Sequence, residues 1–310
     1  MGSFLVERLL SDGWRVRVVD NLSSGRWENL RGVEGHGGLE VVVRDLKEPD
    51  GLGEAFREVD VVFHFAANPN LRVSVEDPRV CFDENLVATF SVLECCRRFK
   101  VDFMVFASSS TVYGEPSRIP TPEDYWPLKP ISVYGSCKLA CEELIGTYSR
   151  LYGVKSLVLR YANVVGPRSS RGVLVDFLRK LRREPGWLEI LGDGSQRKSY
   201  LHVEDAVEAT MRAYYYVEEA GLQEEVFNVG SEDWVTVREI ADLAVEALGL
   251  GGVKYVFRPA TLDGRGWLGD VKFMLLDVSK LRDKTGWRPR LNSRGAVARA
   301  LKELIGEGCQ

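Results

Sequence analysis

The sequence lacks a long apolar segment and an excess of charge of either sign. No apolar run approaches the roughly 20 residues that a membrane-spanning helix requires. The chain carries 41 basic and 45 acidic residues and has no basic stripe, so we expect neither nucleic acid nor a membrane as a partner. Residues 3–10 are apolar at helical spacing but include Glu7 and Arg8, which favours an amphipathic helix over a signal peptide.

Histidines and cysteines are also few, and their spacing is not that of a metal site. None of the three histidines is grouped with carboxylates or cysteines, and His64 falls within a buried strand pattern, where we expect a packed core residue. The cysteines show no CxxC spacing, and most lie in helical patterns; they are Cys81, Cys95, Cys96, Cys137, Cys141 and Cys309. We therefore expect free thiols, no bound metal and a reducing cytoplasmic location.

What the chain does contain is a series of valine-rich runs separated by helical patterns. The 310 residues, of which 45% are hydrophobic, are enough for a substantial core. Buried strands are predicted over residues 16–20, 39–43, 59–67, 101–109 and 154–163, with helices over 79–99 and 134–152. This alternation predicts an α/β fold, a Rossmann-like doubly wound parallel sheet with ligands at the carboxyl ends of its strands.

The pattern loosens after residue 163. Three glycine-rich, charged loops (166–172, 191–200 and 259–270) alternate with helical patterns over 203–219, 236–248 and 293–306. These features predict a smaller α/β substrate domain made of residues 164–198 and 231–310, after a first domain of residues 1–163 with part of 199–230. Residues 116–130 are too rich in proline for regular structure and are expected to form an ordered loop.

Asp20 ends the first valine-rich strand and precedes Asn21. A carboxylate at this place can accept hydrogen bonds from both hydroxyls of an adenosine ribose and would repel a 2′-phosphate, which favours NAD over NADP. The alternative is an aspartate that only ends a strand in a turn. Asp45 and Leu46 follow the next strand and are placed to bracket the adenine.

The pattern YxxxK occurs twice, at Tyr125/Lys129 and at Tyr134/Lys138. The first pair lies among prolines and cannot sit on a regular helix. The second opens a strong helical pattern, where a spacing of four puts both side chains on one face. We expect the Lys138 ammonium to lower the pKa of Tyr134 and to make it a general base. By itself, this pair could also be incidental on a surface helix.

Ser109 ends a buried strand 25 residues before Tyr134. The segments FASSSTVYG (106–114) and PISVYGSCK (130–138) resemble the paired active-site segments of the extended short-chain dehydrogenases/reductases. HFAANPNLRVSVEDPRVCFDENLVATFSVLE (64–94), LRYANVVGPR (159–168) and LEILGDGSQRKSYLHVEDAVEA (188–209) resemble the same family, in the same order. The resemblance covers nearly the whole chain and is strongest to the UDP-glucose 4-epimerases of that family.

The resemblance implies an NAD-dependent interconversion of UDP-galactose and UDP-glucose, with residues 1–163 binding NAD and the smaller domain binding the nucleotide sugar. It implies catalytic roles for Ser109, Tyr134 and Lys138. The implied cofactor contacts are Gly2, Asp20, Asn21, Ser23, Ser24, Asp45, Leu46, Ala66, Ala67, Asn85, Tyr134, Lys138 and Tyr161. The implied nucleotide-sugar contacts are Asn163, Val173, Leu174, Leu191 and Asp270. A homodimer formed through helices 79–99 and 134–152 is also expected.

Two positions depart from the family pattern. Lys198 stands where the family usually has an arginine, and Arg197 is its neighbour. Trp267 stands where a second phosphate-binding arginine is usual, and Arg265 is displaced by two residues. We favour Arg265 as a bidentate pyrophosphate ligand and keep Arg197 and Lys198 as further candidates. For all three, a solvated surface role is the alternative.

The amino terminus resembles the family from the last glycine of its phosphate loop onward, with Gly2 at that glycine. We expect the first strand and the first two glycines to be encoded upstream. The alternative is a chain that has lost its phosphate loop and is a non-catalytic nucleotide-sugar-binding protein. A sheet without its central strand is predicted to have an unpaired edge.

The two residues after Ser109 bear on the reaction. The related 4,6-dehydratases have Asp-Glu at these positions, whereas this chain has Ser110 and Thr111. Without an acid there, dehydration and uronate decarboxylation are disfavoured and 4-epimerisation is favoured. An epimerase for N-acetylated or uronic sugars, and a nucleotide-sugar reductase, remain alternatives.

Overall fold

The computed structural model describes all residues of the chain except 49–50, 71–72 and 308–310. The chain forms two compact units. The first comprises residues 1–109, 133–160 and 210–227, and the second comprises residues 110–132, 161–209 and 228–310. Each unit is described by itself.

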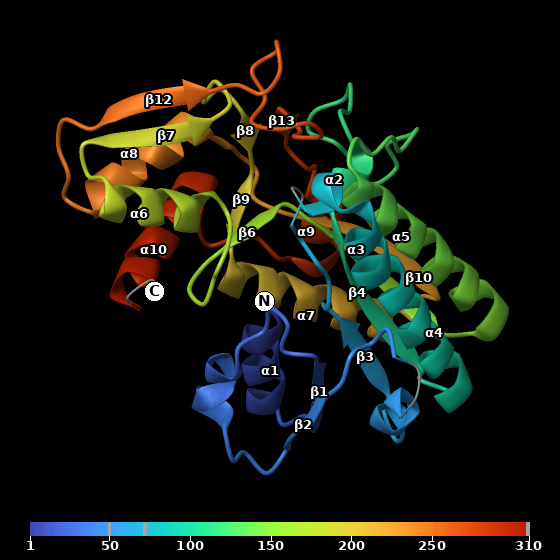
Figure 1. Ribbon diagram of the computed structural model, residues 1–310. Helices are drawn as coiled ribbons and strands as arrows, with labels where there is room; N and C mark the ends of the chain where they lie inside the picture. The colour runs from blue at the N-terminus through green and yellow to red at the C-terminus, as the bar shows by residue number, and fades with distance from the viewer. Residues whose placement is uncertain (49–50, 71–72, 308–310) are drawn as a thin grey trace. The chain divides into compact units, whose positions relative to one another are not determined.

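The strands of the first unit form two separate sheets. The larger sheet has the order β10-β5-β4-β3, with β3 (Val61–His64), β4 (Phe103–Ser109), β5 (Lys155–Tyr161) and β10 (Glu224–Val229). β1 (Val16–Asp20) and β2 (Leu39–Val43) form a parallel pair that is not hydrogen-bonded to β3 (Figure 1). Within the described residues, β1 and β3 each pair on one side only, so the predicted unpaired edge is confirmed.

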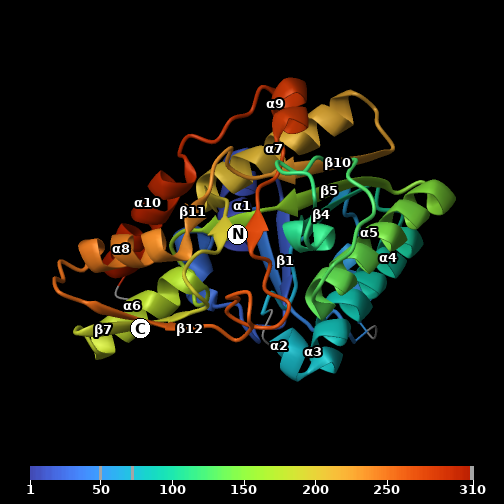
Figure 2. The same ribbon diagram turned by 90° about the horizontal axis from the view of Figure 1, so that it is seen from above.

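Helices cover both faces of the larger sheet. On one face, α4 (Ala88–Phe99) and α5 (Val133–Tyr152) pack side by side against apolar residues of β4 and β5, such as Met104 and Val158. On the other face, Tyr214 of α7 (Val203–Glu219) packs against Phe63 and Phe103. Figure 2 shows α7 across the strands from α4 and α5. The doubly wound α/β architecture predicted from the alternating pattern is therefore present.

The predicted helix over 79–99 is interrupted. It consists of α3 (Pro78–Phe82), a π turn (Asp83–Val87) and α4. The π turn buries Asn85, whose amide donates to the Cys81 carbonyl oxygen at 2.7 Å. Such turns are frequent at functional sites, and this one carries a predicted cofactor contact. α1 (Gly2–Ser11) forms where the amphipathic pattern predicted it, and α2 (Val73–Glu76) is a single turn.

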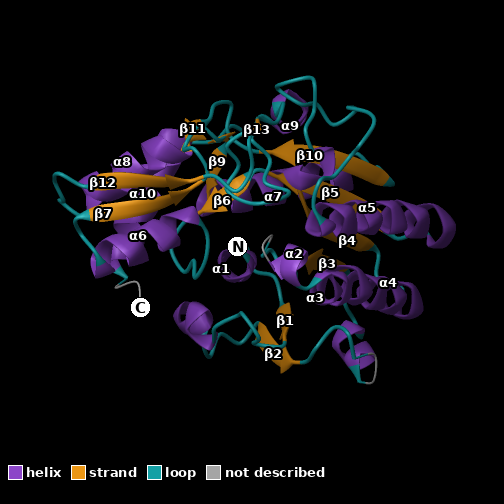
Figure 3. Ribbon diagram, turned by 45° about the horizontal axis from the view of Figure 1, so that its top comes forward, coloured by secondary structure: helices purple, strands orange, loops and turns teal. Residues whose placement is uncertain are grey.

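The second unit has its own core. Parallel strands β7 (Trp187–Leu191) and β12 (Lys254–Arg258) lie against α6 (Val173–Arg183), α8 (Val237–Ala247) and α10 (Ser293–Gly306), as Figure 3 shows. Short strands complete it: β6 (Asn163–Val165) pairs with β9 (Tyr200–His202), and β8 (Arg197–Lys198) pairs with β11 (Val235–Thr236) and β13 (Phe273–Met274). α9 (Ser279–Thr285) precedes α10.

The proline-rich segment 110–132 belongs to the second unit, whereas the sequence boundaries had placed it in the first domain. Its backbone explains the difference. Thr121 N–H donates to the Leu275 carbonyl at 2.8 Å, and the Thr121 carbonyl accepts from the Asn228 amide at 2.9 Å. Hydrogen bonds to residues more than a hundred positions away leave no trace in local sequence patterning.

Candidate active site

The three predicted catalytic residues meet in the first unit. Ser109 is the last residue of β4, while Tyr134 and Lys138 lie in the first turns of α5. The Ser109 hydroxyl donates a hydrogen bond to the Tyr134 oxygen, which favours the phenolate. The Lys138 ammonium lies 5.8 Å from the centre of the Tyr134 ring. The helical spacing of four therefore brings the two side chains onto one face as predicted.

The expectation that the pKa of Tyr134 is lowered is wrong. Burial raises the pKa of Tyr134 well above its usual value, and a negative charge on Cys81 would raise it further. The hydrogen bond from Ser109 acts in the opposite direction but is the weaker influence. A phenolate in a dry site loses more hydration than one serine hydroxyl restores.

Lys138 is itself buried, with 3% of its surface exposed. Its ammonium donates to the Ala107 carbonyl oxygen at 2.8 Å and lies 4.6 Å above the Phe106 ring. Burial lowers the pKa of Lys138 to about 8, although neighbouring Cys141 and Glu142 act to raise it. The charged and neutral forms of this lysine therefore exchange close to neutral pH.

Two cysteines that sequence analysis did not connect with the site pack against Tyr134. Cys81 and Cys137 form a small buried cluster with it. A hydrogen bond from Cys137 lowers the pKa of Cys81. All five cysteines that the structure describes are free thiols, as predicted, and Cys309 lies outside the described residues. His64 is buried and shares a 2.9 Å hydrogen bond with Thr89, which confirms it as a packed residue.

The predicted ribose and adenine contacts also come together. β1 and β2 are parallel, so Asp20 and Asp45 follow neighbouring strand ends at one edge. The Asn21 amide donates to the Asp45 carboxylate at 3.0 Å. Although burial acts against ionisation, hydrogen bonds from the Lys47 backbone and from Asn21 lower the pKa of Asp45. An ionised carboxylate is the form that accepts hydrogen bonds from donors such as an adenine amino group.

A tight turn shapes the backbone after Asp20. The Asp20 carboxylate accepts from the Leu22 N–H at 2.7 Å, and Leu22 adopts a positive φ of 57°. A Cβ on Gly25 would lie 2.7 Å from an Asp20 oxygen, so any other residue there would require the carboxylate to shift. The turn role and the ligand role of Asp20 are compatible, because a carboxylate can accept several hydrogen bonds.

Asn85 provides a test of fit for a bound cofactor. It is 1% exposed, and its amide nitrogen donates to the Cys81 and Asn68 carbonyl oxygens. Its Oδ1 has no hydrogen-bond partner among the described residues. A buried amide oxygen without a partner is costly, so the site fits a ligand that brings a donor.

The other predicted cofactor residues are spread over several elements. Ser23 and Ser24 lie in the turn after Asp20, with the Ser23 N–H bonded to Asn21 at 3.0 Å. Gly2 begins α1, Leu46 follows Asp45, and Ala66 and Ala67 follow β3. Tyr161 ends β5 and falls in the second unit.

In the second unit, Asp270 binds two of the three candidate cations. Asp270 is 1% exposed, and its carboxylate accepts from Lys198 at 2.6 Å. Its carbonyl oxygen accepts from the Arg265 guanidinium at 2.7 Å. Arg265 also pairs with Glu115 and Asp263, both at 2.6 Å. Arg197, in contrast, is exposed and lies over the Phe273 ring, 5.8 Å from its centre.

Gln196 belongs to the same cluster and was missed by sequence analysis. Its amide nitrogen donates to the Leu191 carbonyl at 3.2 Å and approaches the Asp270 carboxylate at 3.4 Å. Its Oε1 is buried without a partner among the described residues. From the GDGSQRK run, the sequence predicts only the basic residues as ligands, because an uncharged glutamine gives no comparable signal.

The remaining predicted substrate contacts lie on other elements of this unit. Asn163 is on β6 and donates to the Ser199 carbonyl at 3.1 Å. Val173 and Leu174 form the first turn of α6, and Leu174 is part of the core. The structure thus brings Leu191, Lys198, Arg265 and Asp270 together, and places Arg197 away from them.

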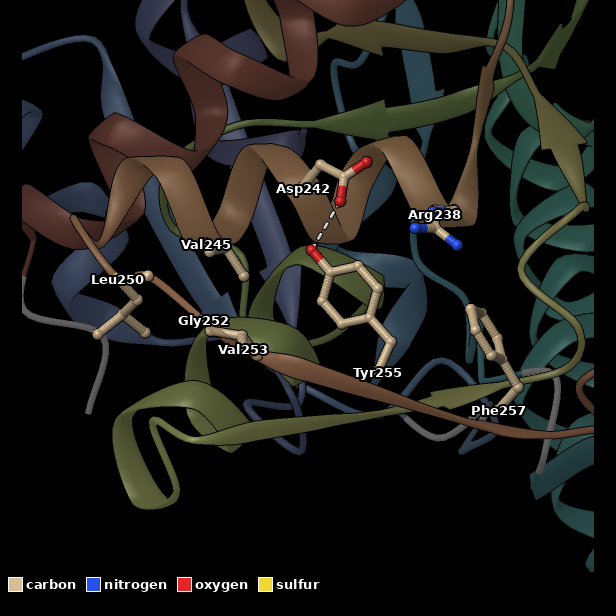
Figure 4. Close-up of a pocket in the computed structure, with 9 residues that line it drawn as sticks. Arg238, Asp242, Val245, Leu250, Gly252, Val253, Tyr255 and Phe257 are labelled. Carbon is tan, nitrogen blue, oxygen red and sulfur yellow. Dashed lines mark hydrogen bonds between the residues drawn. The ribbon is translucent and has the colours of Figure 1, made fainter.

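A separate hollow of about 530 Å³ lies beside α8 and β12 (Figure 4). The Tyr255 hydroxyl donates to Asp242 at 2.7 Å across it, and Arg238 and Phe257 line one end. None of its lining residues is a predicted site residue. In the described part of the chain, no group of three His, Cys, Asp or Glu side chains is arranged to hold a metal ion. Nor does any described helix combine the length and apolar character needed to cross a membrane.

A doubly wound sheet that carries serine, tyrosine and lysine at one strand end and the following helix defines the extended short-chain dehydrogenase/reductase class. Residues 1–230 match the NAD dependent epimerase/dehydratase family, and the chain belongs to this family. It is therefore an enzyme of an NAD-dependent family, and NAD is its cofactor.

Three known proteins show the range of its relatives. The UDP-glucose 4-epimerase of Mycolicibacterium smegmatis is 34% identical over 309 residues, which covers 97% of this chain and 94% of that protein. The crystal structure of a UDP-galactose 4-epimerase is 49% identical, with a TM-score of 0.87 and coverage of 99% and 96%. The UDP-N-acetylglucosamine 4-epimerase of Methanobrevibacter ruminantium is 28% identical, with a TM-score of 0.84 and coverage of 99% and 95%.

Proposed function

We propose that the chain is a UDP-hexose 4-epimerase that interconverts UDP-galactose and UDP-glucose. The observation that carries the proposal is the buried cluster in which Ser109 donates to Tyr134 beside the Lys138 ammonium. Such a cluster can move a proton between a tyrosine and a sugar hydroxyl. The relatives named above, two of which act on UDP-hexoses by name, support the same reaction.

In this mechanism Tyr134 takes the proton of the sugar 4-hydroxyl and later returns it. Ser109 hydrogen-bonds the reacting oxygen and holds it next to the tyrosine. While it is protonated, Lys138 places a positive charge beside the Tyr134 ring, which offsets part of the cost of forming a buried phenolate. The 4-keto sugar then turns about its pyrophosphate and presents its other face, so that reduction produces the opposite configuration at C4.

Bound NAD would supply the acceptor and donor of the C4 hydride, and it would add a positive charge that favours the Tyr134 phenolate. The proposed contacts to it are Asp20 for the ribose, Asp45 for the adenine side and Asn85 through its unpaired oxygen. Tyr134 is buried, which excludes water from the proton transfer.

Ser110 and Thr111 favour epimerisation over elimination. A 4,6-dehydratase needs an acid to remove water across C5–C6, and these two hydroxyl residues cannot provide one at neutral pH. Both lie in a short 3-10 turn directly after Ser109. The absence of a carboxylate at these two positions leaves proton transfer at the 4-hydroxyl as the chemistry that the segment supports.

The decisive experiment is conversion of UDP-galactose to UDP-glucose by the chain with added NAD. Tyr134→Phe removes the proton acceptor and should reduce kcat by about 10²–10⁴-fold. Tyr125→Phe is the matched control, because Tyr125 begins the other YxxxK pattern and its hydroxyl is hydrogen-bonded to Ser117. Turnover that survives Tyr134→Phe, or that depends on Tyr125, would refute the assignment.

Lys198 and Arg265 are proposed as the pyrophosphate ligands. Asp270 holds both, and the other partners of Arg265 are acids with side chains 44% and 52% exposed. Exposed ion pairs are weak, so a pyrophosphate can displace them. Lys198→Gln and Arg265→Gln should each raise KM by about tenfold, whereas Arg197→Gln should change it little.

The second candidate is an epimerase for UDP-N-acetylhexosamines, which the Methanobrevibacter relative favours. A panel of UDP-galactose, UDP-N-acetylglucosamine and UDP-glucuronate compares their kcat/KM values directly. A preference of more than about tenfold for the acetylated sugar would replace the first proposal. Binding of UDP-sugars without turnover of any would instead support the non-catalytic alternative.

We also propose a homodimer formed through α4 and α5, in a cytoplasmic enzyme. The two helices pack together and expose Phe90, Leu151 and Tyr152, with Leu151 67% exposed. Large apolar residues on one exposed face are typical of interfaces. Leu151→Glu should convert a dimer to a monomer in analytical ultracentrifugation, and Leu262→Glu on an exposed loop of the second unit is the control.

A further inference from the structure

We propose that Glu142 is a positioning residue for the catalytic cluster, acting through Ser108, Arg160 and Lys138. The inference rests on the proposed function for its catalytic consequence, but the arrangement itself is observed. Glu142 lies on α5, four residues after Lys138 and eight after Tyr134. Successive spacings of four place the three side chains along one face of the helix.

Three consecutive residues of β4 bind these three residues of α5. The Ala107 carbonyl accepts from Lys138 at 2.8 Å. The Ser108 hydroxyl donates to the Glu142 carboxylate in a short hydrogen bond. The Ser109 hydroxyl donates to Tyr134. The strand end and the helix are therefore joined at three successive positions, of which Glu142 provides the negatively charged one.

Glu142 also forms a buried ion pair with Arg160 of β5. The guanidinium donates to both carboxylate oxygens, at 3.1 Å from Nε and 2.7 Å from Nη2. Both side chains are 7% exposed. With Ser108 on one side and Arg160 on the other, the carboxylate holds α5 against two adjacent strands.

A buried pair of this kind is expensive for stability alone. Well-packed apolar residues in place of such a pair often stabilise a fold equally well or better, because no charged group then has to lose its hydration. Here the carboxylate has a second effect, since its negative charge favours the ammonium form of Lys138 against the cost of burial. Glu142 thus anchors Ser108, the neighbour of Ser109, and favours the charged form of Lys138.

Other titratable groups face Lys138 and also influence whether it is charged or neutral. From the helices these are Tyr134, Cys81, Cys137 and Cys141, and from the neighbouring strand His64. His64 is neutral because burial and the Lys138 charge lower its pKa to about 3. Burial raises the pKa of Cys141 to about 11, so this thiol is also neutral near pH 7. Arg160 acts on Lys138 indirectly, through its ion pair with Glu142.

Glu142→Gln tests the proposal because it removes the charge and keeps the shape. We expect kcat for UDP-galactose to fall by about tenfold or more with little change in KM, because catalytic geometry and charge are affected and substrate contacts are not. The alkaline limb of the kcat–pH profile should move about one unit lower, since Lys138 loses a favourable neighbour. Glu143→Gln, the exposed neighbour on α5, is the matched control.

Glu142→Gln leaves Arg160 buried without its partner and can fail to fold, so a double variant with Arg160→Gln is measured beside it. The pair is then removed as a unit. A folded double variant should keep the loss of kcat and a smaller displacement of the pH profile in the same direction. A double variant with the wild-type kcat and pH profile would overturn the proposal and leave the pair a structural role only.

A readout that needs no turnover separates this proposal from the proposed function. The NMR signal of the Lys138 side-chain nitrogen, assigned by its loss in Lys138→Arg, reports the titration of the ammonium directly. Its midpoint should shift to lower pH in Glu142→Gln even if no UDP-sugar is converted. An unchanged midpoint in a folded variant would contradict the charge role whatever the substrate proves to be.

Discussion

The first unit contains two groups of valine-rich strands that look alike in sequence and differ in the structure. β4 and β5 are almost entirely buried, whereas every residue of β1 is half-buried and β2 is half-buried or exposed. β4 and β5 have strands on both sides and a helix pair over one face, while β1 pairs only with β2 among the described residues. A valine-rich run therefore predicts a strand, but its neighbours decide whether that strand is core.

The two proposed tasks, proton transfer and cofactor binding, fall on different strand groups. The proposed proton-transfer residues stand on the buried strands, where α5 is held by hydrogen bonds at three successive positions. The proposed ribose contact Asp20 ends a strand that is half exposed. The proposed chemistry, which needs a fixed geometry, lies on the buried strands, and the exposed strands carry proposed ligand contacts that cofactor binding itself can stabilise.

The largest expected effect is on folding. Leu157→Ala in β5 removes a side chain with no exposed surface and should lower the free energy of unfolding by about 2–5 kcal/mol. Val18→Ala in half-buried β1 should cost about 1 kcal/mol. Urea unfolding of both variants measures the difference. Equal losses would show that the two strand groups are equally part of the core.

NAD affinity should respond to the exposed strand pair. Asp20→Asn replaces a charged acceptor by a neutral one and should weaken NAD binding by about tenfold or more, as a lost charge-assisted hydrogen bond does. Isothermal titration calorimetry provides the measurement. Asp12→Asn is the control, because Asp12 directly follows α1 and pairs with Arg8 at 2.8 Å. Equal affinities of the wild type and Asp20→Asn would leave Asp20 with its turn role alone.

The buried strands should determine the pH dependence. Burial disfavours the Lys138 ammonium, so this charge is present below its pKa of about 8 and is lost as the pH rises through that value. Turnover that needs the charge should therefore fall by half near pH 8 and by about tenfold for each further unit. A kcat–pH profile that stays flat to pH 10 would contradict a role for the charged lysine.

The smallest effect is expected at an ion pair between the exposed strands. Arg17 of β1 and Glu40 of β2 are direct partners in register, and their side chains meet at 2.6 Å. Glu40→Gln should cost less than about 1 kcal/mol, because the Glu40 side chain is 57% exposed. The thermal unfolding midpoint measures it. A loss as large as that of Leu157→Ala would mean that this pair, like Glu142–Arg160, is held in a dry environment.

Much of the fold follows from local sequence. The strands over 16–20 and 39–43 and the helices over 203–219 and 293–306 have the predicted bounds, because side-chain periodicity depends only on residues two to four positions apart. The same periodicity predicted that Tyr134, and not Tyr125, shares a helix face with a lysine. The family assignment also follows from the order of local motifs.

What the tertiary structure alone decided concerns burial and distant partners. In the folded chain the pKa of Tyr134 is raised, whereas the sequence predicted a lowered one. Residues 110–132 belong to the second unit, and Lys198, not Arg197, is the partner of Asp270. The tertiary structure also revealed Gln196 and the link from Glu142 to Ser108. Each of these depends on residues tens of positions apart in sequence, and the free energy of a charge depends on how much water the folded chain leaves around it.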